Sequence, residues 1–198
     1  MINDLSELYG RQMPQRDLAA TLQNSPDIRL RPAISDDHGL KCGRCGSKLR
    51  HSLASLPNHH FYCYICIQMG RVDTLSPLAY LEEPNHFTEN PDPLSWSGQL
   101  TQLQNECADK VIEVFQQRQR HLLWAVTGAG KTEMLFKGIS WAVSNGLRVG
   151  IASPRVDVCI ELFPRIQAAF NQVSIVLLHG KSEQRYQYSQ IAVCTTHQ

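Results

Sequence analysis

Apolar residues in the second half of the chain follow two alternating patterns. Four short runs, at 121–126, 148–152, 173–178 and 191–194, are almost uninterrupted, which is typical of strands buried in a parallel sheet. Between them, apolar residues recur at helical spacing, and Pro164 is expected to divide the helical stretch after residue 156 in two. Strands alternating with helices predict an α/β fold with a parallel sheet.

The first half of the chain lacks this alternation. Prolines interrupt it repeatedly, and one stretch concentrates cysteines. We therefore divide the sequence into four segments. They are an N-terminal segment at 1–35, a small cysteine-rich domain at 36–75, an irregular linker at 76–95 with a strand near 78–81, and an α/β domain at 96–198.

The cysteine-rich domain contains two C-x-x-C pairs, Cys42 with Cys45 and Cys63 with Cys66, separated by seventeen residues. This spacing is typical of a four-cysteine zinc ribbon, in which each pair aims two thiolates at one Zn²⁺ ion. Four sulfur ligands leave no open position, so the expected metal is structural. Three histidines between the pairs are alternative ligands, although a solvated loop is favoured for them: His51, His59 and His60.

The same stretch, from residue 38 to 71, carries basic residues and no Asp or Glu. Basic side chains interleaved with aromatic ones suit single-stranded nucleic acid. The equally weighted alternative is that the aromatic rings fill the small core of the domain. The residues concerned are Lys41, Arg44, Lys48, Arg50 and Arg71, with Phe61, Tyr62 and Tyr64.

A phosphate-binding loop is predicted between the run at 121–126 and the helix that follows it. Residues 125–132 fit the pattern G-x-x-x-x-G-K-[ST], with Ala125 at the first glycine position. Glycines let backbone N–H groups face phosphate oxygens, Lys131 would reach the β and γ phosphates of ATP, and the Thr132 hydroxyl would ligate Mg²⁺. The expected nucleotide contacts are Thr127, Gly128, Ala129, Gly130, Lys131 and Thr132, with Lys131 and Thr132 in catalytic roles.

Gln104 is a further candidate for nucleotide binding. The sequence Leu-Thr-x-x-Gln at 100–104 resembles the glutamine motif of superfamily 2 helicases. A side-chain amide offers a donor and an acceptor together to an adenine edge. The alternative is that Gln104 is a polar residue at the start of a helix.

Composition and charge restrict the other possibilities. A hydrophobic content of 42% supports a packed core, and a net charge of +1 means that any affinity for nucleic acid must come from local patches. The first residues carry acids and no long apolar run, and no stretch approaches membrane-spanning length, so neither a secretory signal nor a transmembrane helix is expected. These features and the odd cysteine count favour the cytoplasm.

Together these motifs resemble the amino-terminal part of the ComFA family, the helicase-like ATPases of bacterial competence for DNA uptake. The resemblance covers nearly the whole chain. It includes the cysteine ribbon ahead of the phosphate loop, the opening at 8–12, the segments at 100–104 and 127–133, Ser-Pro-Arg-Val-Asp-Val at 153–158 and the segment 195–198. The primosomal helicase PriA shares the motor motifs, but its zinc cysteines lie elsewhere relative to the phosphate loop.

The resemblance implies a RecA-like P-loop motor lobe over 96–198, preceded by the zinc ribbon. It implies an ATP-dependent translocase or helicase on single-stranded DNA, which takes up transforming DNA with ATP, Mg²⁺ and Zn²⁺ as cofactors. Implied partners are ComFC, DprA and the DNA-uptake channel, and the implied location is the inner face of the cytoplasmic membrane. Formation of a homo-oligomer is a further possibility that the resemblance leaves open. Residues matching DNA-backbone contacts are Ser153, Pro154, Arg155, Thr195, Thr196 and His197, with Arg155 and Thr195 favoured.

The sequence ends at Gln198, before an Asp-Glu motif for Mg²⁺ and before a second motor lobe with an arginine finger. We therefore expect the lobe to be truncated and the chain by itself to hydrolyse ATP negligibly. Two other functions remain open: a zinc-dependent module that binds DNA or partner proteins, and a PriA-like helicase of replication restart. A P-loop enzyme unrelated to DNA is disfavoured by the cysteine ribbon.

Overall fold

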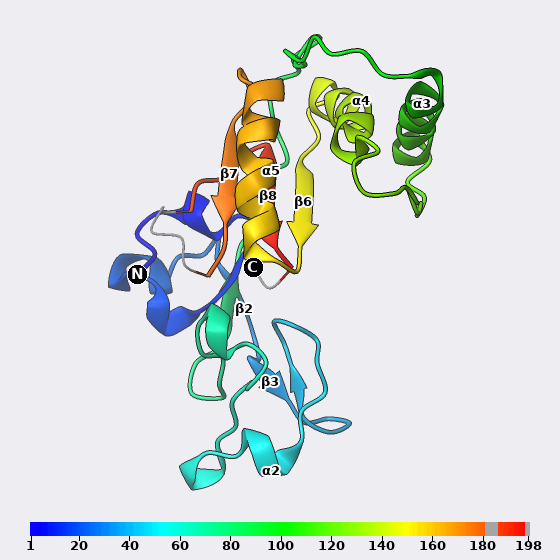
Figure 1. Cartoon of the computed structure of the whole chain (residues 1–198). Coiled ribbons are helices and arrows are strands. Elements are labelled where there is room, and N and C mark those ends of the chain that lie inside the picture. The colour runs from blue at the N-terminus through cyan, green and yellow to red at the C-terminus, as the bar shows by residue number, and fades with distance from the viewer. Residues whose placement is uncertain (181–185, 197–198) are drawn as a thin grey trace. The chain divides into compact units, whose positions relative to one another are not determined.

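The computed structural model describes residues 1–180 and 186–196, and the chain divides into two compact units (Figure 1). The first unit comprises Met1–Pro84 and Gly180–Tyr188, and the second comprises Asn85–His179 and Ser189–Thr196. The finer division of the sequence at residues 35, 75 and 95 remains a prediction.

The first unit is built from very short elements. Its three-stranded antiparallel sheet has the order β1-β5-β2, and a second pair, β3 and β4, forms a small hairpin. The elements are η1 (Leu5–Leu8), β1 (Gln12–Pro14), η2 (Gln15–Asp17), α1 (Ala20–Gln23), β2 (Arg29–Arg31), β3 (Ile34–Ser35), β4 (Lys41–Cys42), α2 (His51–Ala54), η3 (Pro57–His59), η4 (Ile67–Met69) and β5 (Leu78–Tyr80).

Strand β5 holds two small cores of this unit together. Successive side chains of a strand point to opposite faces. Leu78 accordingly packs in the core that contains the cysteines, whereas Ala79 packs with Ile2, Leu8 and Leu18. Both β5 residues are fully buried, so a strand that the sequence places in a linker is the centre of the sheet.

Asp73 is a buried charge that stabilises the first unit. Only 1% of its side chain is exposed, and its carboxylate lies 2.7 Å from Arg16 Nη1 and 2.8 Å from Arg71 Nε. The backbone N–H of Leu75 also donates to it, at 3.1 Å. Burial by itself raises the pKa of this carboxyl, but the hydrogen bond from Arg16 and the charges of both arginines outweigh burial and lower it below 3.8.

Asp73→Asn is expected to lower the free energy of unfolding of this unit by about 3 kcal/mol, because it leaves two arginines without their shared partner. A carboxyl whose pKa is lowered by folding stabilises above its unfolded pKa, and that contribution is lost as pH falls through the folded pKa. The difference between wild type and variant in urea unfolding should therefore be full at pH 6 and shrink below about pH 4. A difference that does not depend on pH would contradict the ion-pair explanation.

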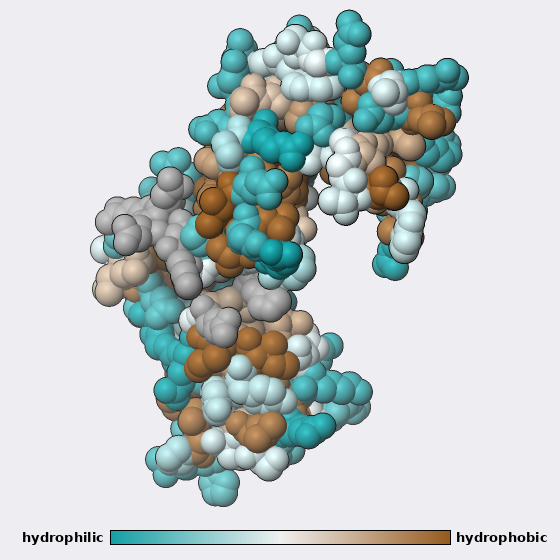
Figure 2. Space-filling model, viewed as in Figure 1, coloured by the Kyte–Doolittle hydropathy of each residue, from teal (hydrophilic) through white to brown (hydrophobic). Residues whose placement is uncertain are grey.

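The second unit contains a three-stranded parallel sheet with the order β6-β8-β7, which confirms the predicted α/β class with a parallel sheet. Helix α5 packs on the sheet, and α3 packs on α4. Figure 2 shows hydrophilic side chains along the outward side of α5, with hydrophobic ones beside them. The elements are α3 (Gln102–Gln116), α4 (Lys131–Ser144), β6 (Val149–Ser153), α5 (Val156–Ala169), β7 (Ile175–Leu178) and β8 (Ile191–Thr195).

The strand predicted at 121–126 does not form. No residue of this segment pairs with a strand within the described part of the chain, and Leu122, Trp124 and Val126 are 76 to 88% exposed. Their alternation with less exposed neighbours is that of an extended segment. A strand is stable only where its N–H and C=O groups find a neighbouring strand, and here β6, β8 and β7 pair with one another instead.

The division predicted at Pro164 is also wrong, because α5 runs unbroken from Val156 to Ala169 with Pro164 inside it. Proline removes one helical hydrogen bond, whose acceptor would be the carbonyl of Ile160. Ile160 lies on the outer side of the helix, at 51% exposure, rather than in the core. Packing of Ile166 and Ala169 in the core keeps the last turns helical.

Candidate metal centre and candidate nucleotide site

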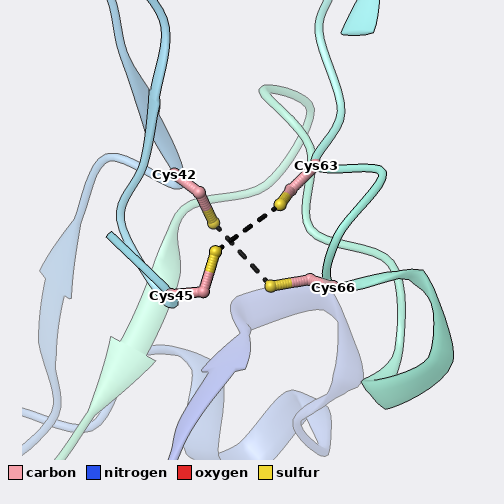
Figure 3. Close-up of side chains that lie close together, drawn as sticks. All are labelled: Cys42, Cys45, Cys63 and Cys66. Atoms are coloured by element: carbon pink, nitrogen blue, oxygen red, sulfur yellow. Dashed lines mark hydrogen bonds between the residues drawn. The ribbon is translucent and has the colours of Figure 1, made fainter. Parts of the chain in front are cut away.

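The four cysteine side chains of the two C-x-x-C pairs converge on one point (Figure 3). Cys42 Sγ lies 3.9 Å from Cys66 Sγ, Cys45 Sγ lies 3.7 Å from Cys63 Sγ, and the four sulfurs all lie within 4.8 Å of one another. A tetrahedron with Zn–S bonds of about 2.3 Å has S···S edges of roughly 3.8 Å. The cluster therefore fits a four-thiolate Zn²⁺ site.

The backbone of the first cysteine pair explains its glycines. The N–H of Gly46 donates to Cys42 O at 2.9 Å, and Gly46 has a φ of 73°, in the region that favours glycine. A Cβ atom on Gly43 would lie 2.5 Å from Pro32 O, so a larger residue would push the chain entering the hairpin away. Both glycines let the turn bring Cys42 and Cys45 to one side.

Arg44 connects the first cysteine pair to the second. Its Nη2 donates to Cys66 O at 3.2 Å and to Gly70 O at 2.6 Å, and its side chain is half-buried. Burial raises the pKa of the Cys66 thiol, and the hydrogen bond and charge of Arg44 act in the opposite direction. Arg44 therefore makes its hydrogen bonds within the metal module, by which we mean the segment around the four cysteines. Lys41, Lys48 and Arg50 are exposed.

Two of the aromatic residues near the cysteines pack inward. Phe61 and Tyr64 are partly buried against the core that contains the cysteines, which supports a structural role for these rings. The histidines between the pairs do not join the metal-binding group within the described residues. His60 instead makes a 3.0 Å hydrogen bond with Thr74 Oγ1.

The predicted phosphate loop leads directly into α4, which begins at Lys131. Gly130 caps this helix in the left-handed conformation, with φ 73° and ψ 35°, and Gly128 has a φ of 81° with open space beside its Cα. Lys131 Nζ donates to the carbonyls of Ala125, at 3.1 Å, and Val126, at 2.7 Å. An exposed glycine loop at a helix N-terminus, with a lysine beside it, can accept a nucleoside triphosphate. The Thr132 hydroxyl would then ligate the Mg²⁺ ion of that triphosphate.

Gln104 contacts this loop. Its Nε2 donates to Ala129 O at 3.0 Å, while its Oε1 accepts from the N–H of Thr101 at 2.8 Å. Thr101 in turn caps α3, so the two residues form a capping box that starts the helix. Each polar atom of the Gln104 amide thus makes one hydrogen bond, which leaves one N–H donor and one acceptor lone pair for an adenine edge.

The two segments predicted to contact DNA lie side by side at the carboxyl ends of β6 and β8. Ser153 is in register with Thr195, and Thr196 N–H donates to Ser153 O at 2.9 Å. Pro154, Arg155 and Thr196 are exposed, whereas Thr195 is only 7% exposed. His197 lies outside the described residues.

Asp157 is a charged residue for which the sequence predicted no role. Arg155 Nε donates to Asp157 Oδ1 at 3.1 Å, and the hydrogen bond with Arg155 lowers the pKa of the Asp157 carboxyl below 3.8. A spacing of two positions does not by itself indicate that two residues pair, so the sequence carried no signal for this contact. Glu133 and Arg165, which also form an ion pair, are 32 positions apart, and no local pattern connects them.

A parallel sheet with a candidate phosphate-binding loop at a helix start defines an α/β protein, and the four-thiol cluster of the first unit is its candidate metal module. Residues 5–80 match the family described as the competence protein ComFA N-terminal domain. Residues 97–198 match the family described as the type III restriction enzyme, res subunit, which is helicase-like. The chain belongs to the ComFA family.

Two curated relatives agree with this assignment. The competence protein ComFA of Bacillus subtilis strain 168 is 41% identical over 161 residues, covering 80% of this chain and 35% of the relative. ComFA of Streptococcus pneumoniae R6 is 38% identical over 168 residues, covering 84% and 38%. The chain thus spans little more than a third of the length of these relatives. No solved structure matches it.

Proposed function

We propose that this chain supplies the metal module and the nucleotide-binding lobe of an ATP-driven motor that moves single-stranded DNA during natural competence. The observation that carries the proposal is the phosphate loop. Its glycines, Lys131 and the start of α4 form an exposed anion-binding cradle within a parallel α/β unit. In this proposal ATP binds residues 127–132, with Mg²⁺ on Thr132 and Zn²⁺ on the four cysteines.

The proposed path of the DNA backbone follows the carboxyl ends of β6 and β8, where ligands of parallel sheets bind. Ser153, Arg155 and Thr196 meet there, so they are the proposed phosphate contacts. Burial of Thr195 makes Thr196, the residue directly after β8, the better contact. Asp157 competes with DNA phosphate for Arg155, because it already binds that guanidinium.

The proposed setting follows the relatives, which are named competence proteins. We propose that the chain works at the inner face of the cytoplasmic membrane with the uptake channel, ComFC and DprA. No helix within residues 1–180 and 186–196 has the length and apolarity that a membrane crossing requires. The second candidate is a docking module for DNA or partners, favoured by the exposed Lys41, Lys48 and Arg50 beside the metal cluster.

The test compares nucleotide and DNA binding in matched variants. Lys131→Ala should weaken binding of a fluorescent ATP analogue at least tenfold with little change in Tm, because the hydrogen bonds that the ammonium makes to Ala125 O and Val126 O are exposed to water. Arg155→Ala should weaken binding of an oligo(dT) strand, whereas Asp157→Asn should strengthen it by releasing Arg155. In the natural polypeptide that carries this chain, ATP hydrolysis should be stimulated by oligo(dT) and lost in Lys131→Ala.

The docking alternative makes the opposite predictions. Partner or DNA binding would survive Lys131→Ala and fail in Cys42→Ala. A motor role would be abandoned if the wild-type chain bound no nucleotide, or if DNA had no effect on ATP hydrolysis by the natural polypeptide.

A further inference from the structure

Glu133 places a negative charge beside the phosphate loop. It lies in the first turn of α4, two residues after Lys131, and its side chain is only 23% exposed. Its Oε2 would lie 3.5 Å from a Cβ atom on Gly130, so the carboxylate packs against the loop itself. A carboxylate here is a neighbour of any triphosphate that binds on the loop, and the two carry like charges.

The two lysines of α4 do not neutralise this charge. Lys137 is one turn from Glu133, the spacing at which Glu and Lys commonly pair on a helix. Lys137 Nζ instead binds Asp109 Oδ1 of α3 at 2.7 Å. The Lys131 ammonium is also committed, to the carbonyls of Ala125 and Val126.

The cation that Glu133 does bind comes from another element. Arg165, on α5, donates from Nη2 to Glu133 Oε1. The pair is partly shielded from water, since 43% of the Arg165 side chain and 23% of the Glu133 side chain are exposed. The contact fixes the direction of the carboxylate and cancels its charge at the edge of the loop.

We infer that Arg165 is a positioning residue of the nucleotide site, which holds and neutralises Glu133 so that a triphosphate can bind beside it. The inference rests on the proposed nucleotide binding and goes beyond it, because the partner of Arg165 is the Glu133 carboxylate and no hydrogen bond joins Arg165 to the loop backbone among the described residues. Its effect is electrostatic: without Arg165, the Glu133 carboxylate repels the bound nucleotide, and more strongly the more charge that nucleotide carries.

The experiment titrates this chain with fluorescent analogues of ATP and ADP in the presence of Mg²⁺. The variants are Arg165→Met, which keeps the apolar stem, Glu133→Gln, and the two combined. Lys110→Met is the matched control, because Lys110 forms an exposed ion pair with Glu113 on α3, at 2.7 Å.

Arg165→Met should weaken ATP binding about tenfold and ADP binding less, and the loss should diminish as salt screens the repulsion. Adding Glu133→Gln to Arg165→Met should restore the affinity for ATP to within threefold of wild type. Lys110→Met should bind both nucleotides as wild type does.

Three results would overturn the inference while leaving nucleotide binding intact. They are an unchanged affinity in Arg165→Met, an equal loss for ATP and ADP with a lowered Tm, and a failure of Glu133→Gln to rescue. The last two would mean that the pair only braces α5 against α4, or that Glu133 itself serves the nucleotide. Absence of nucleotide binding by the wild type would reject the proposed function and this inference together.

Discussion

Removing the metal from the four-cysteine cluster is expected to unfold the core around it. Cys42, Cys63 and Cys66 are fully buried in that core, whose strands β3 and β4 have two residues each. So few apolar contacts cannot hold a module of this size without a further crosslink. In zinc-finger peptides at pH 7, structural Zn²⁺ contributes about 10–16 kcal/mol, which is folding free energy.

We expect one Zn²⁺ per chain by elemental analysis, and none in Cys63→Ser. Both Cys63→Ser and the chelated wild type should become sensitive to proteolysis between residues 36 and 75. Cys107→Ser is the control, because Cys107 lies on α3 outside the cluster. Resistance to protease that persists after complete removal of zinc would show that the module folds without metal.

Gly130→Val is expected to abolish detectable nucleotide binding. Gly130 has a φ of 73°, which a β-branched residue adopts only with strain, and an added Cβ would lie 2.8 Å from Gln104 Nε2. The variant must therefore displace Gln104 from Ala129 O or rotate the loop. Displacing the flexible end of Gln104 is the smaller effect, whereas relief of the strain at this φ rotates the loop and turns its N–H groups away from the phosphates. We therefore expect a loss of at least a hundredfold in affinity for ATP, about 2.7 kcal/mol.

Gly150→Ala is the matched control for this prediction. Gly150 lies in β6 with open space where a Cβ atom would stand, and its φ is outside the left-handed region. Titration with a fluorescent ATP analogue should show wild-type affinity for Gly150→Ala. Wild-type affinity in Gly130→Val would instead mean that the nucleotide does not bind on this loop.

The sites were predictable where the chemistry depends on residues close together in the sequence. Two C-x-x-C pairs can place four thiols together once each pair forms a tight turn, and the sulfurs do converge. The glycines of the phosphate loop, likewise, are needed for backbone angles that other residues avoid. Such local constraints act within a few residues, so they can be recognised without knowing what else surrounds them.

The interpretation of Arg44 and of the segment 121–126 needed the fold. The sequence offered Arg44 as part of a basic surface, but it donates to Cys66 O and Gly70 O, more than twenty positions away. The apolar run at 121–126 has the composition of a buried strand, yet it stays exposed because composition does not supply a pairing partner. Pairing and burial depend on which segments meet, and one segment alone does not contain that information.

The sequence by itself determined that the four cysteines could meet, that glycines with positive φ precede α4, and that the runs at 148–152, 173–178 and 191–194 form strands, because each depends on spacing and local backbone geometry. The tertiary structure alone decided that Asp73 lies between Arg16 and Arg71, that Thr195 is buried, and that Arg165 rather than Lys137 neutralises Glu133. The physical reason is the same in each case: a charge or hydroxyl acquires its role from neighbours that only packing brings within a few ångströms.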